Sequence, residues 1–113
     1  MILEIAVFDI AEGHEAAFEG DFQRAREVLA MAPGHRSNEL LRSHERPSQY
    51  ALLVRWDTIE DHVRGFRGSG LFARWRELLQ PHFGAAPEVV HYLPTTDGAP
   101  SGAVANTATG SSP

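Results

Sequence analysis

The 113-residue chain contains no cysteine. This absence excludes disulfides, thiolate metal sites, iron-sulfur clusters and a cysteine nucleophile in one step. The sequence also lacks a Gly-rich phosphate loop, a GxGxxG fingerprint and a GxSxG elbow, so nothing in it supports a nucleotide or flavin cofactor or hydrolase chemistry. No cofactor is therefore expected, and any redox chemistry is expected to be cofactor-free or to use a site that no motif marks.

Positive charge is also scarce. Lys and Arg number 10 against 15 Asp and Glu, which gives a net charge of -5 and a pI near 5.6. A nucleic-acid partner is not expected, because phosphate binding needs a basic surface. No apolar run approaches the length needed to span a bilayer, and the first eight residues lack a basic leader. The expected location is the cytoplasm, with no membrane partner.

Hydrophobic periodicity predicts an alternation of strands and helices over residues 1–94. A short helix opens at Thr58, and Ser69 caps another that ends before Pro81. The order is β-α-β-β-α-β, which is the ferredoxin-like split βαβ plan of an α+β protein with helices on one face of an antiparallel sheet. The predicted strands are residues 2–10, 35–44, 50–56 and 87–94, and the long first helix is 14–32.

Residues 2–10 are apolar on both strand faces, with Leu3, Ile5 and Val7 on one of them. The predicted helices are sufficient to cover one face of the sheet. We therefore expect the other face to pack on the same face of a second copy, forming a sheet-to-sheet homodimer, a dimeric α+β barrel. The alternative is a monomer whose sheet has one wetted face.

The last part of the chain has a different composition. Residues 95–113 are rich in Gly, Ala, Ser and Thr and contain almost no large apolar side chain. Such a segment cannot build a core. The predicted organisation is one domain at 1–94 followed by a flexible tail at 95–113.

His62 is the first candidate for chemistry. It lies on the predicted apolar stripe of its helix, with Ile59, Val63 and Phe66, so its imidazole is expected to point inward. Its position near the helix N-terminus disfavours the charged form. A neutral histidine can accept a proton from a phenol or hydroquinone. The alternative is a core histidine that is hydrogen-bonded to a backbone carbonyl.

Four aromatic residues and one arginine join His62 in the predicted binding site. Trp56, Phe66, Phe72 and Trp75 suit a planar, polycyclic ligand through stacking and apolar burial, although such stripes are more often plain core. Arg67 is expected at the mouth of the pocket, where it would hold an anionic or carbonyl oxygen. The alternative for Arg67 is that it caps the C-terminus of a helix.

His91 lies in the middle of the last strand, on the face of Val89 and Leu93. It can join the pocket or the dimer interface, or it can be a hydrogen-bonded histidine within the sheet. A metal ion would need several converging ligands, and His62 and His91 with Glu39 are the one trio that the pattern offers. The spacing signature of zinc sites is absent. No metal is therefore predicted.

Four segments between residues 1 and 94 form a recognisable pattern: ILEIAVFDI, PGHRSNELLRS, YALLVRWDTIEDHVRGFRGSGLFARWRELLQPHF and PEVVHYLP. The stretch from Trp56 to Trp75 is its most specific part, with Glu60, His62, Phe66, Arg67, Ser69 and Phe72 in order and register. The pattern resembles the antibiotic-biosynthesis-monooxygenase-like family, and the resemblance covers residues 1–94. It implies a homodimer with facing sheets and a pocket between the sheet and the helices.

Some members of that family oxidise anthrone-like intermediates with dioxygen and without a prosthetic group or metal. By this resemblance His62 would be the base or the substrate anchor. The predicted function is a cofactor-independent monooxygenase that acts on a hydrophobic phenolic or polycyclic substrate. The first alternative is a non-catalytic protein that binds a small aromatic ligand or assists a pathway. The second alternative is haem binding or degradation. The branch of this fold that degrades haem uses an asparagine in the first strand and a histidine in the last helix, and both are missing here, which counts against this alternative.

Overall fold

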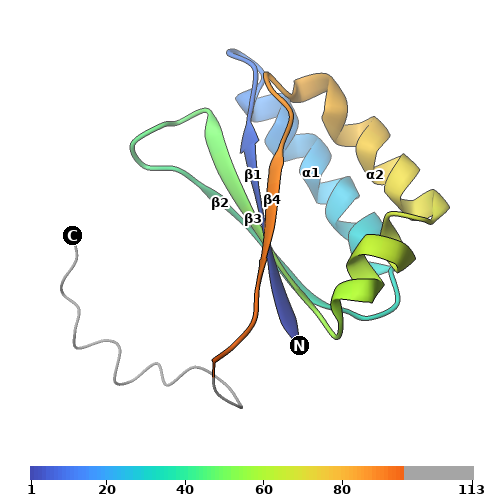
Figure 1. Ribbon diagram of the computed structural model, residues 1–113. Coiled ribbons are helices and arrows are strands. Elements are labelled where there is room, and N and C mark those ends of the chain that lie inside the picture. Colours follow the sequence, from blue (N-terminus) through green and yellow to red (C-terminus); the bar gives the residue numbers. More distant parts are fainter. Residues whose placement is uncertain (96–113) are drawn as a thin grey trace.

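A computed structural model describes residues 1–95 of the chain. Its four strands form one antiparallel sheet in the order β2-β3-β1-β4, and the helices lie on one side of it (Figure 1). The elements are β1 (Ile2–Asp9), α1 (Glu15–Ala30), β2 (His35–Arg42), β3 (Gln49–Trp56), η1 (Asp61–Phe66), α2 (Gly70–Leu79), η2 (Gln80–His82) and β4 (Glu88–Tyr92). The predicted ferredoxin-like α+β architecture is confirmed. Apart from Thr95, the tail predicted at 95–113 lies outside the described residues.

The two faces of the sheet differ in their cover. Along β1 and β3, buried side chains alternate with half-buried ones, as expected for strands whose side chains point to opposite faces in turn. The buried set lies under the helices, where Phe8, Leu52 and Trp56 are almost completely enclosed. The other face carries the half-buried Ile5 and Leu53, which pair with one another across the two strands.

The core joins this inner face of the sheet to the first helix. Phe18, Phe22, Ala25 and Leu29 of α1 are all buried, at the i, i+3 and i+4 spacing of a helix with one apolar face. Phe18 contacts Phe8 of β1 edge to face, with ring centroids 5.8 Å apart. α1 and α2 pack side by side over the sheet (Figure 1). No helix within residues 1–95 is long and apolar enough to cross a membrane.

The turn from α1 into β2 depends on Gly34. Its φ of +87° lies in the left-handed region that glycine tolerates best. A Cβ at this position would overlap the side chain of Asp61, whose backbone N–H is held by Thr58 Oγ1 at 3.1 Å. The turn therefore requires a residue without a side chain.

Gly34→Ala is expected to lower the free energy of unfolding by about 2 kcal/mol, because it combines the left-handed backbone with this overlap. Urea unfolding followed by circular dichroism measures the loss. Gly20→Ala is the matched control, since Gly20 is an exposed position within α1 with open space around it. That variant should be more stable than the wild type by up to about 1 kcal/mol. Equal stability of the two variants would refute this view of the turn.

The segment after β3 departs from the prediction. Thr58 begins it as expected, but η1 is a π-helix, in which the N–H of Arg67 bonds to the carbonyl of His62 at 3.1 Å. The wider turn rotates the side chains relative to an α-helix. His62 and Phe66 are buried, whereas Val63 within η1 is 38% exposed and Ile59, which precedes η1, is 37% exposed. The predicted four-residue apolar stripe was wrong for those two positions.

Candidate functional site

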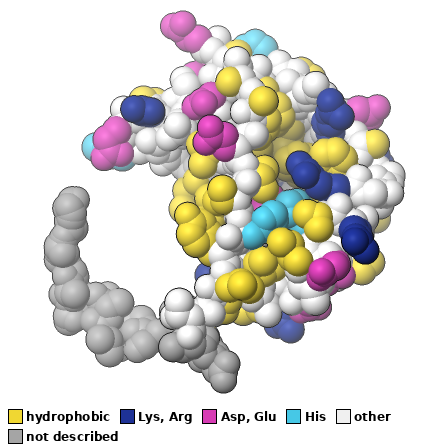
Figure 2. Space-filling view, viewed as in Figure 1, with side chains coloured by type: hydrophobic (Ala, Val, Ile, Leu, Met, Phe, Trp, Pro, Cys, Tyr) yellow, Lys and Arg dark blue, Asp and Glu magenta, His cyan; other side chains and the backbone are white. Residues whose placement is uncertain are grey.

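A cavity of about 750 Å³ lies between the inner face of the sheet and the layer formed by η1 and α2. β1 contributes Glu4, Ala6 and Phe8 to its lining. Histidine side chains come to the surface in the middle of the face shown in Figure 2, between hydrophobic and basic side chains. The opposite side of the cavity is lined by His62, Phe66, Arg67, Phe72, Trp75 and Arg76, and its far end by residues 80 and 83–87.

Glu4 is the acidic group in this cavity. It follows Ile2 and precedes Ala6 on the buried face of β1, and it is 6% exposed. Trp56 Nε1 donates a hydrogen bond of 2.9 Å to Glu4 Oε1. Burial raises the pKa of Glu4 to about 7, because it penalises the charged carboxylate more than the Trp56 hydrogen bond and the charge of Arg67 favour it. The carboxyl is thus poised to gain or lose a proton near neutral pH.

His62 links Glu4 to the edge of the sheet. The residue is 4% exposed, and its imidazole stacks on Trp56, with centroids 5.2 Å apart. Nε2 lies 3.4 Å from Glu4 Oε1, and Nδ1 lies 2.8 Å from His91 Nε2. Burial, and then the neighbouring His91 and Arg67, lower the pKa of His62 to about 4. The imidazole is therefore neutral at pH 7, as expected, but burial is the leading cause.

His91 occupies the outer end of this chain of groups. It lies on β4, the edge strand, directly opposite Glu4 in the register of the β1–β4 pair. Its side chain is half-buried, and burial followed by the charge of Arg67 lowers its pKa. His91 thus stands between the enclosed His62 and the surface of the molecule.

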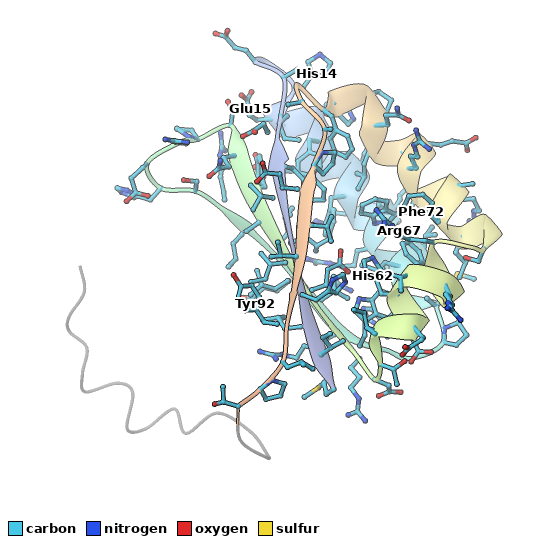
Figure 3. All side chains as sticks on the ribbon, viewed as in Figure 1. His14, Glu15, His62, Arg67, Phe72 and Tyr92 are labelled. Carbon is cyan, nitrogen blue, oxygen red and sulfur yellow. The ribbon has the colours of Figure 1, made fainter. Side chains whose placement is uncertain are left out.

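The walls of the cavity are mainly aromatic. Phe72 and Trp75 of α2 stack with ring centroids 6.0 Å apart, and Phe66 meets both rings edge to face. The guanidinium of Arg67 lies 5.8 Å from the Phe72 ring centroid, in a cation–π contact. Figure 3 shows His62, Arg67 and Phe72 on the helix side of the sheet, while Tyr92 of β4 lies on the other side.

Five of the seven residues predicted for the site line the cavity. They are His62, Phe66, Arg67, Phe72 and Trp75. Trp56 and His91 do not line it: Trp56 is fully buried behind His62, and His91 reaches the cavity through its contact with His62.

The trio considered for a metal ion does not converge. Glu39 pairs with Leu53, and Leu53 with Ile5 of the outer face, whereas His91 pairs with Glu4 of the inner face. Glu39 and His91 thus lie on opposite faces of the sheet. Within residues 1–95, no group of three or more His, Asp or Glu side chains is arranged to hold a metal ion.

Glu4 is the site residue that the sequence analysis missed. The signal was present, because Glu4 is the one acidic residue in the otherwise apolar run of residues 2–8 and shares a strand face with Ile2 and Ala6. An acidic side chain is almost never fully buried without a partner. Its occurrence on the face that also carries Phe8 pointed to a buried acid with a specific partner.

The fold and the cavity together define a ferredoxin-like α+β protein with a small-molecule-sized space between its two layers. The model of the antibiotic biosynthesis monooxygenase family matches residues 1–78. The chain therefore belongs to this family.

Similar proteins agree with that assignment. The uncharacterised protein YczJ of Bacillus subtilis is 37% identical over 92 residues, which cover 81% of this chain and 97% of YczJ. A crystal structure from Bordetella bronchiseptica, of a protein that carries the family's name, is 37% identical, with a TM-score of 0.81 over 84% of this chain and 97% of that one. SnoaB of Streptomyces nogalater, a cofactor-independent oxygenase, shares the fold at 21% identity, with a TM-score of 0.72 over 85% of this chain and 94% of SnoaB.

Proposed function

We propose that the protein is a cofactor-independent monooxygenase that oxidises a hydrophobic phenolic or polycyclic substrate, such as a quinol or an anthrone, with dioxygen. One observation carries this proposal: a buried carboxyl and a neutral imidazole meet at the wall of a cavity that is otherwise largely aromatic. Such a cavity suits a planar ring system, and the two titratable groups can handle its acidic proton. Membership of the family supports the same reaction class.

The chemistry is balanced without a redox cofactor. Removal of a methylene proton from an anthrone leaves a carbanion, whose electron pair forms the bond to dioxygen. Return of a proton gives a hydroperoxide, which loses water as its O–O bond breaks and leaves the quinone carbonyl. The protein has to bind the ring system, accept and return the proton, and keep bulk water from the carbanion.

The arrangement of polar groups favours catalysis over ligand binding alone. A binding pocket needs few polar groups, and His62 by itself would fit that role. Here His62 lies within 3.4 Å of Glu4 and within 2.8 Å of His91, while Arg67 lines the same cavity. Convergence of titratable groups with shifted pKa values in one cavity is typical of a catalytic site.

The partner that we propose is a second copy of the chain. The outer face of the sheet combines the half-buried Ile5 and Leu53 with Leu41, Val90 and Tyr92, which are 44%, 47% and 57% exposed. A contiguous apolar surface of this kind is unfavourable in water. An isologous contact between two such faces would bury it and would form the dimeric barrel.

Oxygen uptake by the chelator-treated protein tests the proposed function. With a panel of anthrones and hydroquinones, the wild type should consume oxygen, and His62→Ala should lower the rate by roughly 100-fold, because one of the two groups that handle the proton is lost. His44→Ala, at an exposed position in the β2–β3 hairpin, should match the wild type. If no substrate draws oxygen while tryptophan fluorescence reports tight binding of an aromatic compound, the protein is a binding protein instead.

A further inference from the structure

We infer that Glu4, rather than His62, is the group that takes the proton from the substrate, and that His62 and His91 form the path by which this proton exchanges with solvent. The inference deepens the proposed function and rests on it. It assigns one task to each of three residues that come from β1, η1 and β4.

Glu4 presents a free oxygen to the cavity. Its Oε1 accepts a hydrogen bond of 2.9 Å from Trp56 Nε1 and lies 3.4 Å from His62 Nε2. Its Oε2 has no hydrogen-bond partner within residues 1–95. In that range, Trp75 Nε1 is the one polar side-chain atom that is both inaccessible to solvent and without a hydrogen bond, so Glu4 Oε2 must be accessible. Glu4 Oε2 is therefore in contact with open space, and Glu4 lines the cavity.

His62 has no nitrogen free for the substrate. One ring nitrogen faces Glu4 and the other is hydrogen-bonded to His91 at 2.8 Å. An imidazole held between two such groups takes a proton on one nitrogen and gives up the proton on the other. The same ring stacks on Trp56, which fixes its plane between Glu4 and His91.

The proton transfer follows from these contacts. The substrate C–H bond breaks, its electron pair stays on carbon, and the proton goes to Glu4 Oε2. The protonated carboxyl then turns its Oε2–H group toward His62 Nε2, which lies 3.4 Å from Oε1 in this structure, and the proton passes to that nitrogen. His62 passes its Nδ1 proton to His91 Nε2, and His91 exchanges with solvent at the sheet edge.

The charged groups around Glu4 suit a base that works near neutral pH. η1 contributes the neutral His62, β4 contributes His91, and the cations that line the cavity are Arg67 and Arg76. The positive charge of Arg67 favours the carboxylate, but burial dominates and keeps the pKa of Glu4 at about 7. A base with a pKa near the working pH is both available and strong enough to take a proton.

Anaerobic deuterium exchange tests this assignment separately from oxygen chemistry. Anthrone in D₂O is the probe, and mass spectrometry measures deuterium wash-in at its methylene carbon above the uncatalysed rate. Glu4→Gln should lower the catalysed exchange by at least 100-fold. Glu12→Gln, an exposed matched control outside the cavity, should exchange as the wild type does. In the wild type the exchange rate should rise with pH around a midpoint near 7.

His91→Ala separates the path from the base. Without His91, the proton on Glu4 returns to the carbanion more often than it leaves, so the ratio of deuterium exchange to oxygen uptake should fall by about tenfold. A purely structural role of His91 would lower both rates together and would refute the path. Wild-type exchange that persists in Glu4→Gln would overturn the assignment of Glu4. Oxygen uptake without Glu4-dependent exchange would also overturn the assignment of Glu4, but it would leave the proposed monooxygenase function intact. Glu4-dependent exchange without oxygen uptake would reject the monooxygenase function and keep Glu4 as the base.

Discussion

Leu53→Asp is expected to abolish the dimer and to leave a monomer or an unfolded chain. Leu53 lies at the centre of the outer sheet face, paired with Ile5 on β1 and Glu39 on β2. In the proposed dimer this position is enclosed by the partner's sheet, and an unpaired carboxylate there would cost several kcal/mol. Sedimentation velocity and circular dichroism measure the assembly and the fold of the variant.

Val63→Asp is the matched control for this substitution. It also introduces a carboxylate at an apolar position, but Val63 is exposed on η1, on the helix side of the sheet. This variant should remain a folded dimer. A Leu53→Asp protein that is a fully folded dimer would refute burial of the outer face.

Glu4→Gln is expected to change how stability depends on pH. Burial raises the pKa of Glu4 from 4.5 to about 7 in the folded chain. Between these values the folded state keeps a proton that the unfolded state has released, so the contribution of Glu4 to stability falls as the pH rises and then levels off above 7. The difference in unfolding free energy between the wild type and Glu4→Gln should fall by about 3 kcal/mol from pH 4.5 to 7.

His62 should contribute with the opposite sign. Burial lowers its pKa from 6.5 to about 4, so between these values the unfolded state binds a proton that the folded state does not, and stability rises with pH. In the wild type, the pH dependence of stability that comes from Glu4 therefore opposes the one that comes from His62. Glu4→Gln should therefore gain stability more steeply than the wild type as the pH rises, and His62→Phe less steeply. Urea unfolding between pH 4.5 and 8 measures all three proteins; parallel curves would contradict a buried, proton-sharing pair.

The strands were predictable because apolar side chains occupy both faces of the central strands. β3 alternates fully buried residues such as Leu52 and Val54 with half-buried ones such as Leu53, and both faces of such a strand read as apolar in the sequence. Strand ends were less accurate, since the prediction ran to residues 44 and 94 where β2 and β4 end at Arg42 and Tyr92. Those extra residues are compatible with a strand, and Ser43 still donates its backbone N–H to the carbonyl of Gln49 at 2.8 Å, but they lie beyond the paired residues of the sheet.

The site was predictable in part. An apolar stripe identified the inward position of His62. The sequence pattern of an aromatic residue is the same whether the side chain lines a cavity or fills the core. For that reason Trp56 was assigned to the wall, although it lies behind His62. Glu4 was missed because its importance comes from Trp56 and His62, whose contacts with it cross 52 and 58 residues of sequence. Such pairings depend on strand register, which local pattern does not specify.

The central claim, that this chain inserts oxygen into an aromatic substrate without a cofactor, is tested most directly by isotope labelling. The chelator-treated protein would be incubated with anthrone under ¹⁸O₂, and the quinone analysed by mass spectrometry. One ¹⁸O atom is expected in the new carbonyl, formed at a rate that depends on His62 and Glu4. Product that carries oxygen from water, or no product above the uncatalysed rate from any anthrone or quinol, would contradict it.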